Sequence, residues 1–565
     1  MKRLLFCFLA GLFLPIGVVA QCPDEWVQQI SGLPNGMLGG HRLTVVLDGN
    51  DNVYVSNVIT NAQSLTAGGQ DYSDFSADAL NNSAYVARVL SSGQFSWLQI
   101  IEGEGLMSVL DISADDEGNV YVAGYTTEKL TIGSIEVTGP GPNQPGYFIL
   151  KIDSLSNVSW VRSTDWPNSR CSSIEWTGEG LAFGIAYSDS VTIGSEIIHE
   201  DASSSANHQD VVFGVLNSDG SLVSMVNIGG SGDIDIASLK CNELSCLMQG
   251  KFSEQFSYSG IEHTTSSNLH FSLYQLSLSL DGTVNWSNTS TNTDQLTILS
   301  HDMGILVNGD AFFTGGYAYS SIAMDNLTVN APSQVPGTFI GKVSGANGTT
   351  TLLEEISANG QGWNKPMSVN GEHVLIGASF NGSQFILDDL TIYNSETGSF
   401  DGVILSLDKD GRVRCGVGVY GEGDNEIRAI EYSSDSHLVV LVTFNGTVEF
   451  GGQTYMAQGN YDLLVIKTCL PCDTLTSIAE TPTTNPTLHI YPNPANQSVR
   501  LQLSGNSQQI NAVEVTDMLG HAVLRNRLAP TGQQIDISGL ASGIYTLAAT
   551  LQSGETLRQR LVVQH

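Results

Sequence analysis

One unit of about 65 residues recurs along this chain, and this repetition constrains the fold more than any other feature. Its clearest copy contains "NVYVAGY" (119–125), and blurred copies return at intervals of about 62–67 residues. Such self-similarity is typical of repeat architectures, in which each unit buries its faces only against its neighbours. Aligned on Val120, the other copies are "NVYVSNV" at Val53, "LAFGIAY" at Ala182, "SCLMQGKF" at Cys246, "AFFTGGY" at Phe312, "HVLIGASF" at Val374 and "LVVLVTF" at Leu438.

Each copy predicts four short strands, of which the aligned stretch is the first. A second short segment follows, such as "TIGS" (131–134). The third segment alternates apolar and polar residues, as in "YFILKID" (147–153), and a turn then leads to a fourth, such as "VSWVRS" (158–163). Four meandering strands without helical periodicity are typical of a β-propeller blade, so the seven copies predict an all-β, seven-bladed β-propeller.

The seventh copy lacks a fourth strand, because "CLPCDT" (469–474) is a poor strand sequence. The N-terminal stretch "CPDEWVQQI" offers a replacement. We therefore expect strand 24–30 to complete the last blade and to close the ring, which leaves no unpaired edge. This alignment places Trp26 where the fourth strands of other copies carry Trp97, Trp160 and Trp286, which predicts that these side chains pack between blades.

The N-terminus is typical of a secretory signal. Two basic residues precede the apolar run "LLFCFLAGLFLPIGVV", and a cleavage site after Ala20 makes residues 1–20 a predicted signal peptide. Cys22, just after this site, makes a lipoprotein lipidated on that cysteine an alternative. Gln21 argues against it, because glutamine is an unfavourable residue before a lipidated cysteine. No later run is long and apolar enough to span a bilayer, so we expect a secreted protein, free or attached to the cell surface.

The balance of charge excludes some partners. The chain has 57 Asp and Glu against 22 Lys and Arg, a formal net charge of −35. Nucleic acids and anionic membrane surfaces need a basic footprint, so neither is an expected partner. Solubility outside the cell explains the acidity better.

Cysteines in an exported chain predict disulfides. Cys22 precedes the closing strand, and Cys469 and Cys472 follow the last third strand, so we expect Cys22 to pair with one of them. The alternative is that Cys469 and Cys472 pair with each other or stay reduced. Cys241 and Cys246 flank a turn and are candidates for a bridge across a hairpin.

The repeat also resembles a known family. "DDEGNVYVAG", the following "TIGS" and "YFILKID…VSW" resemble the bacterial β-propeller repeats of secreted surface proteins, written D-x-x-G-N-x-Y-V-x-G. The second copy matches well and most others are degraded. The common period extends the predicted propeller over residues 21–472.

The amino-acid composition of the chain changes beyond Cys472. Residues 473–487 are rich in Thr and Pro and are predicted to be a linker. Residues 488–565 contain short alternating stretches separated by turn residues, which predict a small β-sandwich of the Ig-like kind.

This C-terminal segment resembles the type A sorting domain of the type IX secretion system in bacteria of the Bacteroidetes type. The resemblance implies passage through the type IX secretion machinery, which recognises residues 488–565, followed by cleavage and by release or surface attachment of the rest. The matching residues are Tyr491, Pro492, Asn493, Pro494, Asp517, Leu519, Gly520, Leu540, Gly543, Ile544, Tyr545, Arg560, Leu561, Val562 and Val563.

Catalytic signatures are absent from the sequence. There is no G-x-S-x-G, no H-E-x-x-H and no cluster of histidines with zinc-ligand spacing. We therefore predict no catalytic residues, no cofactor and a non-enzymatic role in binding, adhesion or scaffolding. The alternatives are an extracellular carbohydrate-active enzyme, a lyase or hydrolase with its site over the propeller channel, and a structural component of a surface matrix.

Two features remain candidates for ligand binding. Trp166 and Trp363 lie outside the repeat register, in stretches expected to be loops on one propeller face, where a glycan or protein ligand would bind. The Asp-rich turns "LDGNDN" (47–52) and "DKDGR" (408–412) have oxygen ligands that suit weak calcium binding. Ordinary hairpin turns, which favour Asp, Asn and Gly, explain most such sequences.

Overall fold

Every regular element among the described residues of this computed structural model is a strand. The chain divides into two compact units, Met1–Cys472 and Asp473–His565. The predicted signal peptide and residues 473–486 of the predicted linker lie outside the described residues. The structure describes residues 25–33, 43–60, 64–73, 75, 81–164, 167–200, 208–265, 271–292, 299–317, 321–330, 337–356, 366–371, 373–382, 384–387, 390–395, 398–434, 437–450, 453–469, 487–491, 495–504, 510–517, 521–527, 534–551 and 556–564.

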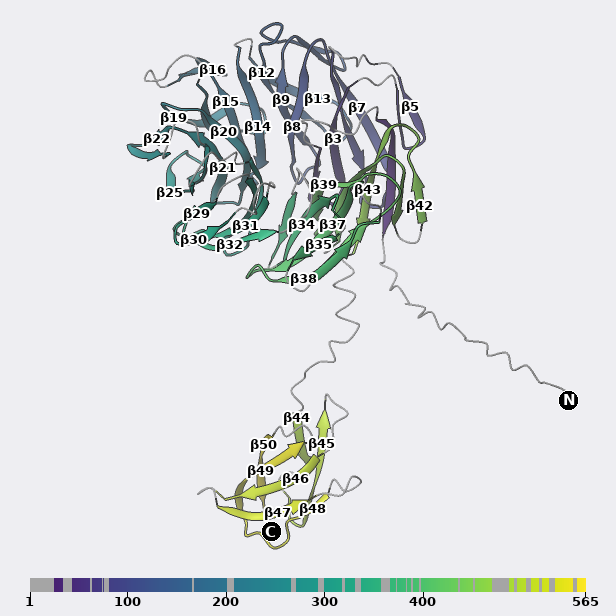
Figure 1. Cartoon of the computed structure of the whole chain (residues 1–565), viewed down its shortest axis with the longest axis vertical. Coiled ribbons are helices and arrows are strands. Elements are labelled where there is room, and N and C mark those ends of the chain that lie inside the picture. The colour runs from purple at the N-terminus through teal and green to yellow at the C-terminus, as the bar shows by residue number, and fades with distance from the viewer. Residues whose placement is uncertain are drawn as a thin grey trace, which may run out of the picture. The chain divides into compact units, whose positions relative to one another are not determined.

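The first unit is a β-propeller built from four-stranded antiparallel meanders, and the described residues form seven of them (Figure 1). The first strands are β2 (Thr44–Leu47), β8 (Met107–Ala114), β14 (Ser169–Trp176), β20 (Ile234–Cys241), β27 (Leu299–Ile305), β33 (Met367–Asn370) and β39 (Asn425–Tyr432). The second strands are β3 (Val53–Ile59), β9 (Val120–Thr126), β15 (Leu181–Tyr187), β21 (Ser245–Ser253), β28 (Ala311–Tyr317), β34 (His373–Phe380) and β40 (Leu438–Phe444). The third strands are β6 (Ser83–Val89), β12 (Gly146–Ile152), β18 (Asp210–Leu216), β24 (Phe271–Ser279), β31 (Gly337–Val343), β37 (Asp401–Asp408) and β43 (Tyr461–Thr468). The fourth strands are β7 (Phe95–Gly103), β13 (Val158–Ser163), β19 (Leu222–Gly230), β25 (Val284–Thr289), β32 (Thr350–Ile356), β38 (Val413–Val419) and β1 (Trp26–Leu33).

The order of strands within each meander corrects the sequence analysis. "NVYVAGY" forms β9, which is the second strand of its meander and lies between β8 and β12. The first strand, β8, was missed. The "TIGS" segment is also not a blade strand, because β10 (Lys129–Ile132) turns back into β11 (Ile135–Thr138) as a separate hairpin.

Such hairpins join the second and third strands, and within the described residues three of them pair with the outer strand of the preceding meander. β10 pairs with β7, β4 pairs with β1, and β22 pairs with β19. An outer strand that would otherwise expose unpaired backbone groups is thereby covered. The other hairpin strands are β4 (Leu65–Ala67) with β5 (Gln70–Tyr72), β16 (Ser190–Ile193) with β17 (Glu196–His199), β22 (Gln255–Tyr258) with β23 (Ile261–Thr264), β29 (Ile322–Met324) with β30 (Leu327–Val329), β35 (Gln384–Leu387) with β36 (Leu390–Tyr393), and β41 (Thr447–Phe450) with β42 (Gln453–Met456), while the short β26 (Thr291–Asn292) pairs with β29.

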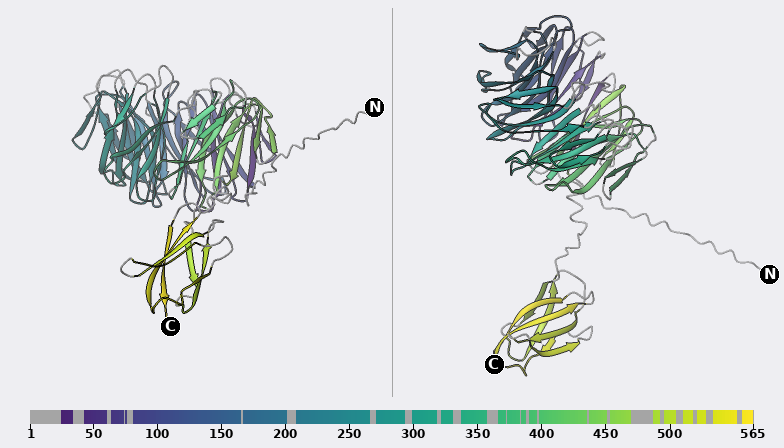
Figure 2. Two further views of the ribbon diagram at one scale, coloured as in Figure 1. Left: turned by 60° about the horizontal axis from the view of Figure 1, so that its bottom comes forward. Right: turned by 60° about the vertical axis from the view of Figure 1, so that its left-hand side comes forward.

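The N-terminal strand is the fourth strand of the last meander. β1 pairs antiparallel with β43, with Trp26 opposite Lys467 and Gln28 opposite Val465. The side chains of Glu25 and Thr468 are hydrogen-bonded at the start of this pairing. The seven first strands contact one another in sequence, and β39 contacts β2, which completes a circle (Figures 1 and 2). The number of blades stays a prediction, which these meanders and their circular contacts support.

The core of the propeller lies between consecutive sheets. The second strands β3, β15 and β40 are buried along their whole length, because a neighbouring sheet covers each of their faces. Val53 of β3 and Val439 of β40 belong to one buried cluster, which fills the space between the first and last meanders. Continuous apolar runs in these strands follow from burial on both sides.

The second unit consists of two antiparallel sheets over a shared core. One sheet has the order β44-β45-β48 and the other β47-β46-β49-β50. Val499 and Ile535 from the first sheet meet Val513 and Leu547 from the second in one buried cluster. The Ig-like classification stays a prediction. The strands are β44 (Thr487–Tyr491), β45 (Ser498–Ser504), β46 (Ile510–Thr516), β47 (Ala522–Arg527), β48 (Gln534–Asp536), β49 (Gly543–Leu551) and β50 (Thr556–Val563).

Candidate functional site

The first strands are held to one another by side chains, because they pair with second strands and not with each other. Asp111 of β8 is the clearest case. Its Oδ2 atom accepts hydrogen bonds from the backbone N–H of Ile174 (3.0 Å) and the hydroxyl of Ser173 (2.7 Å), both on β14. A bulge between Val109 and Asp111 sets this register.

The same connection recurs around the circle. The hydroxyl oxygen of Ser173 accepts the N–H of Leu239 on β20 at 3.1 Å. Asp302 of β27 accepts the N–H of Met367, which begins β33, at 3.1 Å. A side-chain acceptor on one first strand thus binds a backbone donor on the next, which satisfies groups that no sheet ladder reaches.

A second row of connections lies two residues further along the strands. The hydroxyl oxygen of Ser113 accepts the N–H of Trp176 at 2.8 Å, and that of Ser368 accepts the N–H of Tyr432 at 3.0 Å. Ser368 also donates its hydroxyl to Oε1 of Glu431 at 2.6 Å.

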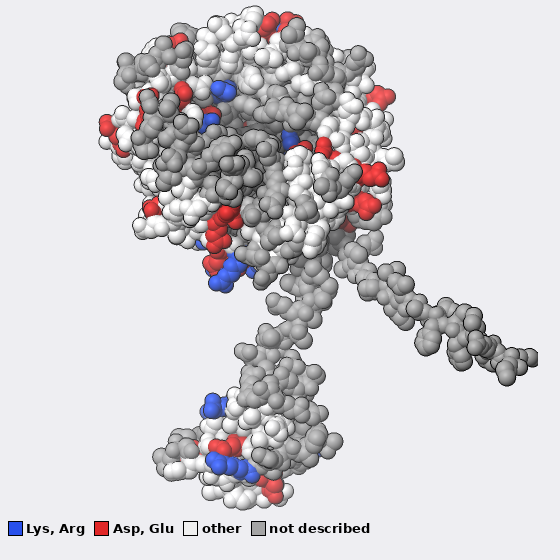
Figure 3. All heavy atoms as spheres, viewed as in Figure 1, with Lys and Arg blue, Asp and Glu red and all other residues white. Residues whose placement is uncertain are grey.

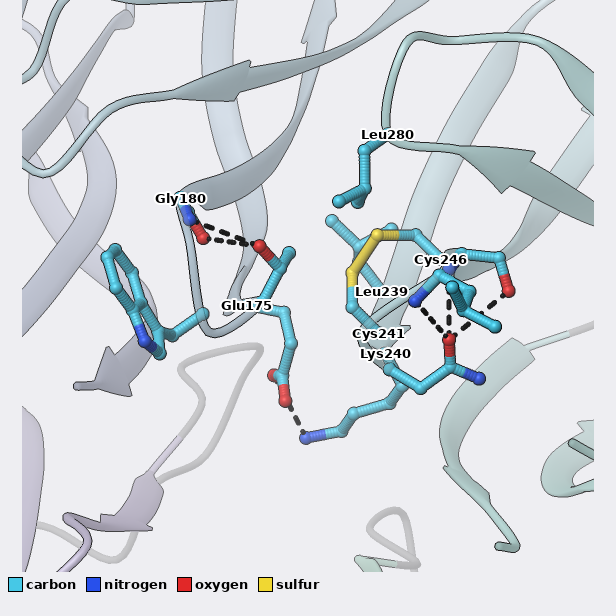
Figure 4. Close-up of a disulfide and its surroundings, with 12 residues drawn as sticks. Glu175, Gly180, Leu239, Lys240, Cys241, Cys246 and Leu280 are labelled. Carbon is cyan, nitrogen blue, oxygen red and sulfur yellow. Dashed lines mark hydrogen bonds and ion pairs between the residues drawn. A yellow bond between two sulfur atoms is a disulfide. The ribbon is translucent and has the colours of Figure 1, made fainter. Parts of the chain in front are cut away.

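Charged residues occupy this second row on three of the strands. Glu175 of β14, Lys240 of β20 and Glu431 of β39 each lie two residues beyond a bulge. Glu175 Oε2 lies 3.6 Å from Lys240 Nζ, and the two side chains point toward one another in Figure 4. Both side chains are partly buried, with exposed fractions of 26% and 31%. Together with Asp111 and Asp302 they form what we call the first-strand charge cluster.

The pKa values of this cluster reflect burial and crowding of like charges. Burial raises the pKa of Glu175 to about 7, and Asp111, Glu431 and Asp302 add to the rise while Lys240 opposes it. The Glu175 carboxylate raises the pKa of Lys240 against the effect of burial. Burial also raises the pKa of Glu431, although Lys240 and the Ser368 hydroxyl oppose this.

The chemistry open to this cluster follows from its composition. One ammonium group lies among four carboxyl groups, and Glu175 exchanges its proton close to neutral pH. Such a carboxyl group meets the pKa requirement of a general acid or base. Within the described parts of the chain, no three His, Cys, Asp or Glu side chains are arranged to hold a metal ion.

In each Asp-rich turn, the aspartate carboxylate accepts hydrogen bonds from N–H groups of the same turn. Oδ1 of Asp48 accepts the N–H groups of Asn50 (2.9 Å) and Asn52 (3.0 Å). Its Oδ2 accepts the side-chain amide of Asn52 (2.8 Å) and the hydroxyl of Tyr54 (3.2 Å), and a nitrogen of the Arg88 guanidinium group lies 3.6 Å away. The carboxylate is therefore engaged within the protein.

The second calcium candidate has the same kind of turn. Oδ1 of Asp408 accepts the N–H groups of Asp410 (2.9 Å) and Arg412 (3.0 Å). The Asp410 side chain is paired with Lys409 at 3.4 Å. Weak calcium binding at these turns stays a prediction.

The tryptophans at the repeat position pack between meanders, as predicted. Each indole N–H donates to a backbone carbonyl in the turn between the third and fourth strands of the next meander. Gly220 in one such turn has a φ of +79°, and a Cβ atom there would lie 2.9 Å from the Trp160 ring. The bonds run from Trp26 to Ser91 (3.1 Å), Trp97 to Ser154 (3.2 Å), Trp160 to Ser218 (3.0 Å) and Trp286 to Gly345 (2.8 Å).

The cysteine predictions have separate outcomes. Cys241 and Cys246 form a disulfide across the turn between β20 and β21, next to Lys240 (Figure 4). Cys22 and Cys472 lie outside the described residues, so the predicted pairing of Cys22 stays a prediction. Cys469 is disulfide-bonded, and so is Cys415, for which the sequence analysis offered no partner.

The predicted ligand-face residues, Trp166 and Trp363, also lie outside the described residues. Neither the first-strand charge cluster nor the connections around it were predicted from the sequence. A signal was present, because a polar or charged residue precedes the turn of several copies, as in "SSIEW" and "IASLK". Its members lie in different copies, so no local motif joins them.

The predicted sorting residues belong to the second unit. Tyr491 ends β44, while Pro492, Asn493, Pro494 and Gly520 are not among the described residues. Gly543 begins β49, and the hydroxyl of Tyr545 donates to the backbone carbonyl of Ala541 at 2.9 Å. On β50, Leu561 is buried, Arg560 is exposed and Val562 is half-buried.

Two protein families match parts of this chain. Residues 489–564 match the secretion system C-terminal sorting domain, and residues 97–130 match the β-propeller repeat. The chain matches no curated protein. The sorting domain implies the type IX secretion machinery and an extracellular or cell-surface location. No described helix is long and apolar enough to cross a membrane.

Solved structures align with most of the chain at very low identity. Hydrazine synthase of Kuenenia stuttgartiensis is 11% identical, covering 72% of this chain and 96% of its own, with a TM-score of 0.34. A Dyadobacter fermentans protein of unknown function is 9% identical, covering 79% and 100%, with a TM-score of 0.38. A Synechocystis apocarotenoid oxygenase variant is 9% identical, covering 80% and 96%, with a TM-score of 0.37. Scores this low carry no argument about function.

On the face of the propeller that Figure 3 shows, acidic side chains lie at separate places, with fewer basic side chains between them. A spread of this kind favours solvation over a single charged docking patch.

Proposed function

We propose that this exported propeller protein is a binding or scaffold module that presents a ligand face on a rigid ring. The observation that supports a non-enzymatic role is the use of the carboxylates on the first strands. Asp111 and Asp302 accept backbone N–H groups of neighbouring strands, and Glu431 accepts the Ser368 hydroxyl. A carboxylate that accepts such bonds is less available to attack a substrate or to take a proton from it.

We place the ligand, a glycan or a protein, on the loops of one propeller face. Trp166 and Trp363 would contribute aromatic surface there, because exposed indoles bury large apolar area against sugar rings and peptides. Weak calcium binding at an Asp-rich turn is a further proposal within this role.

The test is a binding screen of residues 21–565 against glycan and protein arrays, with and without calcium. A reproducible hit that is lost on combining Trp166→Ala with Trp363→Ala supports both the role and the face. Tyr393→Ala is the control, because it removes an aromatic side chain that is 67% exposed on β36. Binding that survives the tryptophan changes refutes the face, and silence on every array refutes the binding role and favours a structural matrix component.

One observation favours a second candidate, an extracellular carbohydrate-active lyase or hydrolase. Glu175 has a pKa of about 7 and lies in a cluster with other carboxyl groups, which suits a general acid for glycosidic bond cleavage. An activity screen on polysaccharides would compare the parent chain with Glu175→Gln. Turnover that this change abolishes would establish the enzyme and overturn the proposal of a purely binding role.

A further inference from the structure

We propose that Cys415 of β38 forms a disulfide with Cys22, which precedes β1 in the sequence. This bond ties the N-terminal strand covalently to the meander that ends in β38, in addition to the hydrogen bonds within its own meander. The pairing differs from the one that the sequence predicts for Cys22. It rests on the register of the fourth strands and on the turns that these strands contact, and it is independent of any ligand.

The partner of Cys415 belongs to the place where β43 and β1 meet. Cys415 is disulfide-bonded. The structure excludes three candidates, because Cys241 is bonded to Cys246 and Cys171 is a buried free thiol. Once the predicted signal peptide is removed, the remaining candidates all come directly after β43 or directly before β1 in the sequence; they are Cys22, Cys469 and Cys472.

Cys415 occupies the register position that tryptophans hold in other fourth strands. It lies opposite Ser406, which adjoins a bulge, and Trp160 lies opposite the residue that adjoins the equivalent bulge in β12. Side chains at this position contact the turn between the third and fourth strands of the next meander. A small residue keeps the contact, since the hydroxyl of Ser224 donates to the carbonyl of Leu280 at 2.8 Å. In the meander that follows β38, the third and fourth strands are β43 and β1.

The register of β1 gives Cys22 the turn position that faces Cys415. Cys22 lies four residues before Trp26, as Gly93 lies four residues before Trp97. A Cβ atom at Gly93 would lie 2.8 Å from the Cβ atom of Trp26, on the preceding fourth strand. The Cβ atoms of a disulfide lie about 3.8 Å apart, so a small shift brings two cysteines at these positions to bonding distance.

Other turns show the same approach. A Cβ atom at Gly348 would lie 2.4 Å from the Trp286 ring, so glycine leaves room for the large side chain. Where the position carries a side chain, that side chain reaches the preceding fourth strand, because the hydroxyl of Ser156 donates to the side chain of Gln99 at 3.2 Å. In the last meander both the turn position and the residue that it faces are cysteines, and a covalent bond replaces the packing of a ring against glycine.

The second bond follows from the first. Cys469 is also disulfide-bonded, and with Cys22 joined to Cys415 its partner is Cys472. Each bond forms by thiol–disulfide exchange with an external disulfide. One protein thiolate attacks that disulfide, and the second displaces the attached thiol, so two protein thiols are oxidised to one S–S bond. The external disulfide is reduced to two thiols, which take up the two protons. An exported chain meets such oxidants outside the cytoplasm.

Peptide mapping by mass spectrometry without reduction identifies the pairing. The chain 21–565 is purified from an oxidising compartment, its free thiols are alkylated, and it is digested with trypsin. Cleavage after Lys and Arg places Cys22 in peptide 21–42, Cys415 in peptide 415–428, and Cys469 with Cys472 in peptide 468–500.

The possible pairings give different masses. We expect peptide 21–42 linked to peptide 415–428, and peptide 468–500 joined to no other peptide and carrying an internal bond. A complex of all three peptides overturns the proposal, and so does peptide 468–500 linked to either of the others. Alkylation of Cys22 or Cys415 in the parent chain overturns it as well.

The variant Cys415→Ser checks the pairing independently. Peptide 21–42 should then gain one alkyl group, because Cys22 has lost its partner, while peptide 468–500 keeps its internal bond. Combining Cys241→Ser with Cys246→Ser is the control, which should leave the link between peptides 21–42 and 415–428 intact. A thiol that becomes reactive in peptide 468–500 on changing Cys415 would assign the partner to Cys469 or Cys472 and overturn the proposal.

Urea unfolding measures what the bond contributes to the closed ring. It closes a loop that contains most of the propeller, whereas Cys241 and Cys246 are only 5 positions apart. A disulfide restricts the unfolded chain more when its loop is longer. The unfolding midpoint should therefore fall further for Cys22→Ser combined with Cys415→Ser than for Cys241→Ser combined with Cys246→Ser. A fall no larger than that of the control overturns the stabilising role of the bond.

Discussion

Asp48 should contribute more to the stability of the propeller than other aspartates in turns of the same form, and Asp48→Ala tests this. The Asp48 side chain is fully buried, and it accepts bonds from Asn52 and Tyr54 beside the Arg88 guanidinium group. Its removal leaves Arg88, which is only 14% exposed, without its ionic partner. Arg88 would keep its bond to the carbonyl of Ser154 (2.9 Å) in the next meander.

The expected loss can be estimated from these contacts. Removing one partner of a buried charged pair costs about 3–5 kcal/mol, because an uncompensated charge stays behind. Asp153→Ala is the matched control. Asp153 accepts the N–H groups of Leu155 (2.9 Å) and Asn157 (2.7 Å) in a turn of the same form, at a more exposed site and with no ionic partner among the described residues. Its loss should cost about 1 kcal/mol.

Urea unfolding followed by tryptophan fluorescence measures both variants in the full chain. The free energy of unfolding should fall at least twice as far for Asp48→Ala as for Asp153→Ala. Equal losses would show that the turn alone matters and that the buried ion pair adds nothing.

Two further predictions concern the contacts between and within meanders. Trp160→Phe keeps an aromatic ring but removes the indole N–H, which leaves the Ser218 carbonyl with only its bond from Lys151 (3.3 Å). Urea unfolding should show a loss of about 1 kcal/mol, and no loss would contradict a stabilising role for the indole bond. Replacing Cys241 and Cys246 by Ser opens a very short loop, so the free energy of unfolding should fall by no more than about 2 kcal/mol, and loss of the folded propeller would refute a local role.

The repeat predicts the propeller because burial dictates its pattern. The second and third strands lie between sheets, so their apolar runs recur in every copy and survive sequence drift. The first strands were not predicted, because bulges interrupt the alternation of apolar and polar residues. They also carry polar residues such as Asp111 and Ser173, whose side chains bond to the next meander. "TIGS" was placed in a blade because a short hairpin strand has the same alternation as a blade strand.

The charge cluster escaped prediction for a different reason. Glu175 and Lys240 are 65 positions apart in the sequence and meet only because consecutive meanders bring their first strands together. The closing strand was easier to find, since Trp26 repeats the position that Trp97 and Trp160 hold in other fourth strands. A contact that recurs between meanders places the same residue type in several copies of the repeat, whereas a pair that forms once produces no recurring pattern.

Hydrogen exchange in β1 tests the central claim, which is that the N-terminal strand closes the ring as part of the last meander. Peptides covering residues 26–33 and 461–468 can be compared in one mass-spectrometry experiment on the full chain. If β1 is held as firmly as its partner β43, the amides of both strands exchange only when the whole propeller unfolds. Fast exchange in residues 26–33 beside slow exchange in residues 461–468 would contradict this closure.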